Sequence, residues 1–225
     1  MITALARLIG VTALGSWLDR QPEWTAAWLR LGVVLVVFAT PLLALAFGRL
    51  AYGDAFWWLW LDAFVVGVWT LVTLVSRRAP GDAVAFFAVH YLVMFTLIPG
   101  VLYAWLLGPQ LPPAQAWLAL VVLGAASLVV HGWATRRAWW PPSQPGSRRP
   151  RTGEIVALSL WPYLRLAVVY AALFVPLAIP GVAQFDARPV TRADAAAATW
   201  VLLGVKLALE VVLALVHVVR VAGRR

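Results

Sequence analysis

The chain has 225 residues, of which 63% are hydrophobic and 12% are charged. Soluble globular domains carry about a quarter charged residues, so this composition favours a membrane protein over a water-soluble domain. The formal charge of +9 does not indicate nucleic acid, because the basic residues lie in short links between long apolar blocks. The absence of Cys excludes disulfides, thiolate nucleophiles and Cys-ligated zinc or iron–sulfur centres.

The apolar blocks predict an all-α membrane protein with a short N-terminal segment. Residues 1–24 contain an apolar run without a convincing signal-cleavage site, so we interpret them as an interfacial helix. Residues 25–225 form one predicted domain, a bundle of about six transmembrane helices that are long enough to cross a bilayer. The expected spans are 29–50, 56–76, 83–107, 113–135, 155–179 and 196–221.

The arginine distribution predicts the orientation of this bundle. An even number of spans places both termini on the same side of the membrane. Twelve arginines lie on that side: Arg7, Arg20, Arg77, Arg78, Arg136, Arg137, Arg148, Arg149, Arg151, Arg220, Arg224 and Arg225. Three lie on the other side: Arg49, Arg188 and Arg192. Because cytoplasmic links are enriched in Arg and Lys, we expect cytoplasmic termini and a multi-pass protein of the cell membrane.

The 14 tryptophans are also typical of a membrane protein. Tryptophan favours the zone between lipid headgroups and hydrocarbon, because its ring is apolar and its N–H is polar. We therefore interpret most of them as interfacial anchors. This set includes Trp17, Trp24, the segment 56–60, Trp139 and Trp140.

Ionisable side chains inside apolar spans are the candidate functional residues, because each costs several kcal/mol in hydrocarbon unless it is paired, neutralised or hydrated. Lys206 and Glu210 stand one helical turn apart, so they project from one face of the last span. Arg165 lies near the middle of the fifth span. We expect an Arg165–Glu210–Lys206 network, with Asp62 of the second span joined through water or paired locally.

This charged set has two interpretations. It could form a proton or ion path or a polar solute cavity, and Glu210→Gln should then abolish transport while the protein still assembles. It could instead fix the register of the helices, as some buried polar groups do. No catalytic residue is assigned, because the phosphate-loop, nucleophile-elbow and dinucleotide motifs are absent from the sequence.

His90, His131 and His217 stand alone in the third, fourth and sixth spans. All three lie toward the predicted cytoplasmic half, so together they could ligate a transition metal, or two of them could hold haem. No paired-histidine motif occurs, and hydrogen bonds to neighbouring helices without any cofactor are the favoured alternative. Ser127, one turn before His131, is interpreted as a helix contact and not as a catalytic serine.

Several segments resemble the uncharacterised membrane family DUF6498. They cover roughly residues 50–220 and read AYGDAFWWLWLDAFVVGVWTLV, AFFAVHYLVMF, SLVVHGWA, WPYLRLAVVYAALF and VKLALEVVLALVH. The resemblance points to the ionisable residues already selected by their cost: Asp62, His90, His131, Arg165, Lys206 and Glu210. It supports the membrane architecture but implies no activity, because the family has no established one.

Three functions remain open at this point. The first is the handling of an ion, a proton or a small polar solute through the charged set. The second is a non-catalytic accessory subunit of a larger membrane complex, which would explain the absence of motifs. The third, ranked last, is a membrane enzyme that holds metal or haem through its histidines. Expected partners are the lipid bilayer and other membrane subunits or a second copy, but not nucleic acid.

Overall fold

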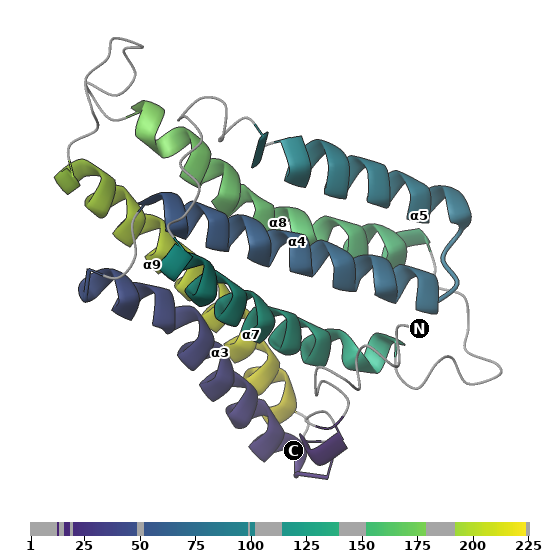
Figure 1. Ribbon diagram of the computed structural model, residues 1–225. Coiled ribbons are helices and arrows are strands. Elements are labelled where there is room, and N and C mark those ends of the chain that lie inside the picture. Colours follow the sequence, from purple (N-terminus) through teal and green to yellow (C-terminus); the bar gives the residue numbers. More distant parts are fainter. Residues whose placement is uncertain are drawn as a thin grey trace.

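The computed structural model describes residues 13, 16–18, 20–48, 52–98, 100–101, 114–139, 152–178 and 192–223. These residues form helices and turns, and no strand occurs among them. The all-α class is therefore confirmed for this part of the chain. The helices are α3 (Glu23–Ala46), α4 (Tyr52–Ser76), α5 (Gly81–Phe87), η1 (Ala88–Leu97), α7 (Ala114–Trp139), α8 (Thr152–Ala178) and α9 (Arg192–Ala222), as Figure 1 shows.

Three helical stretches are long and apolar enough to cross a membrane. They are Glu23–Ala46, Asp54–Ser76 and Thr199–Val219. Two shorter apolar stretches, Gly81–Met94 and Leu120–Trp133, lie between them in the sequence. This pattern suggests a helical membrane protein, as the composition indicates.

Helix α3 begins and ends earlier than the predicted span 29–50. The chain is extended at Pro22, with φ −52° and ψ 141°, and Glu23 lies in the first helical turn. A carboxylate there interacts favourably with the positive end of the helix dipole. The helix ends before Gly48, whose φ of +65° is a left-handed conformation that glycine adopts at little cost.

The predicted interfacial segment 1–24 overlaps the start of α3. Glu23 and Trp24 belong to that helix and pack with it. Most of the segment lies outside the described residues, so the expectation of an interfacial helix stays a prediction.

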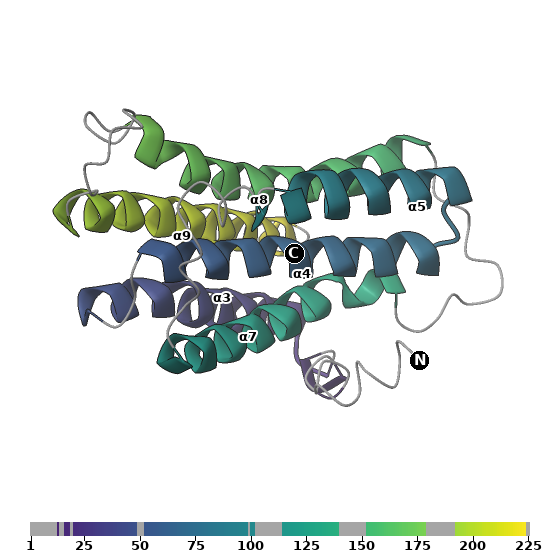
Figure 2. The same cartoon turned by 45° about the horizontal axis from the view of Figure 1, so that its top comes forward.

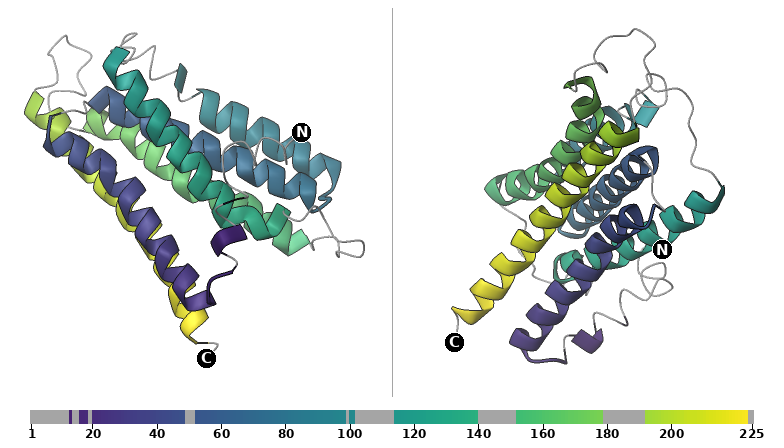
Figure 3. Two further views of the ribbon diagram at one scale, coloured as in Figure 1. Left: turned by 60° about the horizontal axis from the view of Figure 1, so that its bottom comes forward. Right: turned by 90° about the vertical axis from the view of Figure 1, so that its left-hand side faces the viewer.

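Helix α4 lies at the centre of the bundle. It packs along α7 and α8 and also contacts α5, η1 and α9. Figure 2 shows α4 between α5 and α8 on one side and α3 and α7 on the other. Helix α9 packs mainly along α3, and Figure 3 shows this pair side by side. Buried positions of α4 are therefore surrounded by other helices and not by lipid.

The tryptophans in the first half of α4 show this most clearly, and they correct the interpretation of segment 56–60 as interfacial anchors. Trp58 is 1% exposed and belongs to the main hydrophobic core. The Trp60 indole donates a hydrogen bond to the Thr96 carbonyl of η1, with Nε1 2.6 Å from the oxygen. These rings pack inside because α4 is covered by its neighbours.

Within the predicted span 83–107, the chain changes from α-helix to π-helix at Ala88–Leu97. Tyr91 of this segment is fully buried, and its hydroxyl donates to the Ala63 carbonyl of α4 at 2.9 Å. A Cβ at Gly67 of α4 would clash with the Tyr91 ring, so glycine permits this close approach. Long π-helical stretches are rare and occur mostly near functional sites.

Candidate functional site

The ionisable residues selected from the sequence meet where α4, α7, α8 and α9 pack together. Asp62 comes from α4, Arg165 from α8, and Lys206 and Glu210 from α9. Each of these four side chains is buried, with exposed fractions between 1% and 8%. We refer to these four residues, together with Ser127 and His131 of α7, as the charged network.

Glu210 is held by two cations. Arg165 donates from Nε to Oε1 at 2.7 Å and from Nη2 to Oε2 at 2.9 Å. Lys206, one turn earlier on the same helix, donates from Nζ to Oε1 at 2.7 Å. This arrangement gives the bidentate geometry in which arginine pairs most strongly with a carboxylate. The predicted Arg165–Glu210–Lys206 contacts are therefore present.

Asp62 joins the network directly and not through water. Its Oδ2 lies 2.5 Å from Lys206 Nζ. Its Oδ1 accepts a hydrogen bond from Ser127 Oγ at 2.5 Å and lies 3.0 Å from His131 Nε2. Ser127 and His131 are one turn apart on α7, so both reach the same carboxylate oxygen. Their spacing was visible in the sequence, but their partner on α4 was not.

An aromatic residue that sequence reasoning did not select, Phe38 of α3, lies beside this network. The Lys206 ammonium lies 5.0 Å from the centre of its ring, within the range of a cation–π interaction. The His131 and Trp58 rings lie 5.9 and 5.8 Å from the Phe38 ring. Phe38 therefore provides an apolar wall next to the charges, where electrostatic interactions are stronger than in water.

The four charges of the network balance. Asp62 and Glu210 are two carboxylates, and Arg165 and Lys206 are two cations. A buried charge is tolerated when it is both paired and hydrogen-bonded, and every member here meets an opposite charge. Because Lys206 touches both carboxylates, it links two ion pairs into one unit.

Asp62, His131 and Glu210 form a group that could hold a metal ion, since one ligand atom from each lies within 4.8 Å of the others. Carboxylate oxygens and an imidazole nitrogen suit a divalent transition metal. The Lys206 ammonium, however, already contacts both carboxylates. In this arrangement a lysine cation supplies the positive charge that a metal would otherwise supply.

The described residues do not bring the three predicted histidine ligands into one group. His131 belongs to the charged network, whereas His90 places Nδ1 2.6 Å from the Tyr163 hydroxyl of α8 and stacks on Phe86 at 4.8 Å. His217 is half-buried near the end of α9 and does not belong to the group around Asp62. The hydrogen bond from His90 to a neighbouring helix matches the alternative that the sequence favoured.

One family model matches the chain over residues 20–224, and it is described as a family of unknown function, DUF6498. The chain belongs to the DUF6498 family. This confirms the resemblance drawn from the sequence segments. The matched range contains every residue of the charged network and every helix described above. No curated protein and no solved structure matches the chain.

One charged residue of this DUF6498 protein was missed by sequence reasoning. Arg30 of α3 lies one residue inside the predicted span 29–50, where it was counted neither with the flanking arginines nor with the buried set. Its guanidinium carbon lies 6.0 Å from the centre of the Trp133 ring of α7. Arg30 is half-buried, and the charges of Arg165 and Glu210 act on it.

Proposed function

We propose that this DUF6498 protein handles a proton, another small ion or a small polar solute inside the cell membrane, and that Asp62 is the group that exchanges charge. The observation that carries this proposal is the position of Lys206, whose ammonium lies 2.5 Å from Asp62 and 2.7 Å from Glu210. Charged residues at this depth in membrane proteins commonly mark ion and proton pathways.

A lysine between two carboxylates supports more than one stable arrangement. If Asp62 binds a proton or a solute cation, Lys206 can keep its ion pair with Glu210. The opposite change is less favourable, because loss of the Glu210 charge would leave the bidentate Arg165 without its anion. Exchange at Asp62 therefore leaves every remaining charge with a partner, which a transport cycle requires.

The proposal includes six membrane spans with both termini in the cytoplasm. Three long apolar helices and the arginine bias support this topology. Since the chain has no Cys, single cysteines can be introduced without a background. In intact cells, a membrane-impermeant maleimide should label Phe47→Cys but should label Arg77→Cys only after the membrane is opened. The reverse pattern would exclude this orientation.

The functional test uses proteoliposomes with imposed proton, sodium or potassium gradients and an entrapped indicator dye. The wild-type protein should dissipate at least one gradient, and Asp62→Asn should reduce that flux to the level of empty vesicles. The matched control is Asp82→Asn, the same substitution at an exposed carboxylate of α5, which should keep the flux. Undiminished flux in Asp62→Asn would exclude exchange at Asp62 and leave the accessory-subunit function.

A further inference from the structure

Arg30 is a cation inside an apolar helix without an opposite charge among the described residues. It lies in Glu23–Ala46, a stretch apolar enough to cross a membrane. Its one contact in the described part of the chain is the Trp133 ring, 6.0 Å away. A cation in such a stretch is costly unless it is paired or reaches the polar interface.

The carboxylates of the charged network do not supply the missing anion. Glu210 uses both oxygens for Arg165 and Lys206. Asp62 uses both oxygens for Lys206, Ser127 and His131. With the two network cations balanced by these two carboxylates, Arg30 adds one uncompensated positive charge beside them.

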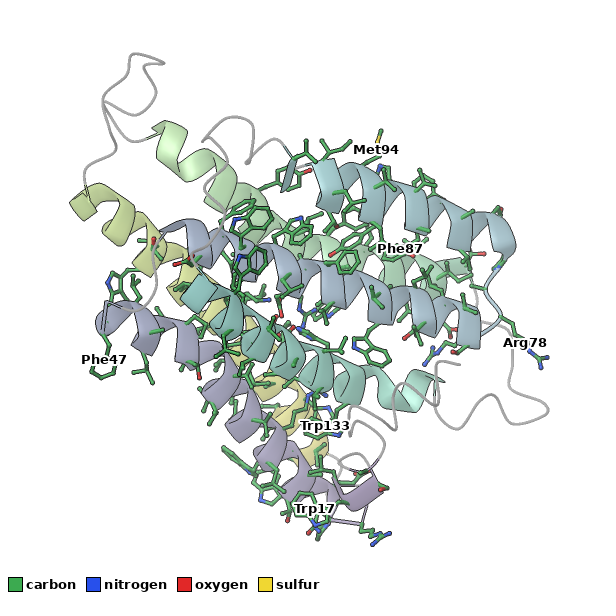
Figure 4. The ribbon with its side chains drawn as sticks, in the orientation of Figure 1. Trp17, Phe47, Arg78, Phe87, Met94 and Trp133 are labelled. Atoms are coloured by element: carbon green, nitrogen blue, oxygen red, sulfur yellow. The ribbon has the colours of Figure 1, made fainter. Side chains whose placement is uncertain are left out.

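The position of Arg30 indicates which ligands can reach it. One turn earlier on α3, Ala27 packs against Val218 and Val221 near the end of α9. Figure 4 shows Trp133 toward that end of the bundle. Trp24 and Trp28 form an edge-to-face pair 5.5 Å apart on the preceding turns, as is typical of the headgroup zone.

We propose that Arg30, with Trp133 against its face, binds a phosphate oxyanion, either in the headgroup of an anionic phospholipid or as a free anion. The Trp133 ring can cover one face of the planar guanidinium and leave its N–H edge open. That edge presents two parallel donors, which match two oxygens of a phosphate. The bound anion would supply the charge that Arg30 lacks. This inference does not depend on ion transport, because it concerns binding at equilibrium.

The experiment compares the purified full-length wild type with Arg30→Gln, Arg30→Lys and Arg77→Gln in a neutral detergent. Arg77 is exposed after α4 and serves as the matched control. One arm measures binding of phosphatidylglycerol and of phosphatidylcholine by native mass spectrometry. The other arm measures thermal unfolding in inorganic phosphate and in chloride at equal ionic strength.

We expect the wild type and Arg77→Gln to bind phosphatidylglycerol or phosphate about tenfold or more tightly than Arg30→Gln does. Arg30→Lys should fall between them, because it keeps the charge but loses the paired donors. An effect of phosphatidylglycerol alone identifies a lipid headgroup, and an effect of inorganic phosphate identifies a free anion. Equal binding of both probes by the wild type and Arg30→Gln would overturn the proposal.

Stability without added anion provides a second criterion. Arg30→Gln removes an unpaired cation, so the variant should unfold at the same or a higher temperature than the wild type in lipid-free detergent. A marked decrease that phosphate does not influence would show that Arg30 has a protein partner, and it would overturn the proposal as well.

Discussion

Asp62 and Glu210 belong to the same network, but the groups around them differ. Glu210 receives all of its contacts from cations, and two of the three come from Arg165. Asp62 receives one neutral donor from Ser127, one imidazole contact from His131 and one ammonium contact. Arginine stays protonated in proteins, whereas the partners of Asp62 are neutral or can release a proton.

This difference separates a fixed end of the network from a changeable end. The Arg165–Glu210 side ties α8 to α9 with two parallel hydrogen bonds. The Asp62 side ties α4 to α7 through donors that can also serve a protonated or cation-bound carboxyl group. Only Lys206 belongs to both ends, so each substitution below tests how independent the ends are.

The largest effect is expected for Glu210→Gln. This change leaves the buried Arg165 without its anion, which typically costs about 3–5 kcal/mol of stability. Unfolding in mixed micles of increasing denaturing-detergent content, followed by tryptophan fluorescence, would measure the loss. The double variant Glu210→Gln with Arg165→Gln should recover most of it, because it removes both charges. A loss below about 1 kcal/mol in the single variant would show that Arg165 does not depend on Glu210.

A smaller effect is expected for Asp62→Asn. The amide keeps an oxygen for Ser127 and His131, and Lys206 keeps Glu210. The lost contact is one charge-assisted interaction, so stability should fall by about 1.5–3 kcal/mol in the same assay. If Asp62→Asn instead destabilised the protein more than Glu210→Gln, the fixed and changeable ends would have to be exchanged.

The members of the network were predictable from the sequence because burial of a charge is costly wherever it occurs. That criterion selected Asp62, Arg165, Lys206 and Glu210 without any knowledge of the packing. The contacts of Lys206 and Glu210 on one helix followed from their spacing of one turn. Direct contact between Lys206 and Asp62 did not follow, since it depends on how α4 and α9 cross.

The residues that were missed share a different cause. Phe38 looks like any apolar residue of α3, and only the packing of α3 on α9 places it beside Lys206. Trp58 was interpreted as an anchor because a central helix and a peripheral helix can have equally apolar sequences. Arg30 stands near a predicted helix end, where arginine is common and attracts no attention.

The smallest effect is expected for Ser127→Ala, which removes one neutral donor from Asp62 and keeps His131 in place. Hydrogen bonds between membrane helices average about 0.6 kcal/mol, with a maximum near 1.7 kcal/mol, so the loss should fall in that range. Ser159→Ala on α8 is the matched control for the substitution itself, and it should change stability less.

The same substitution made in the Asp62→Asn background completes a double-mutant cycle. If the Ser127 hydroxyl donates to a charged carboxylate, its removal should cost less once residue 62 is a neutral amide, because charge-assisted hydrogen bonds are roughly twice as strong as neutral ones. An equal cost in both backgrounds would mean that Asp62 already carries a proton in the wild type. Lys206 would then rest on Glu210 alone, and the changeable end of the network would be described in its proton-bound form.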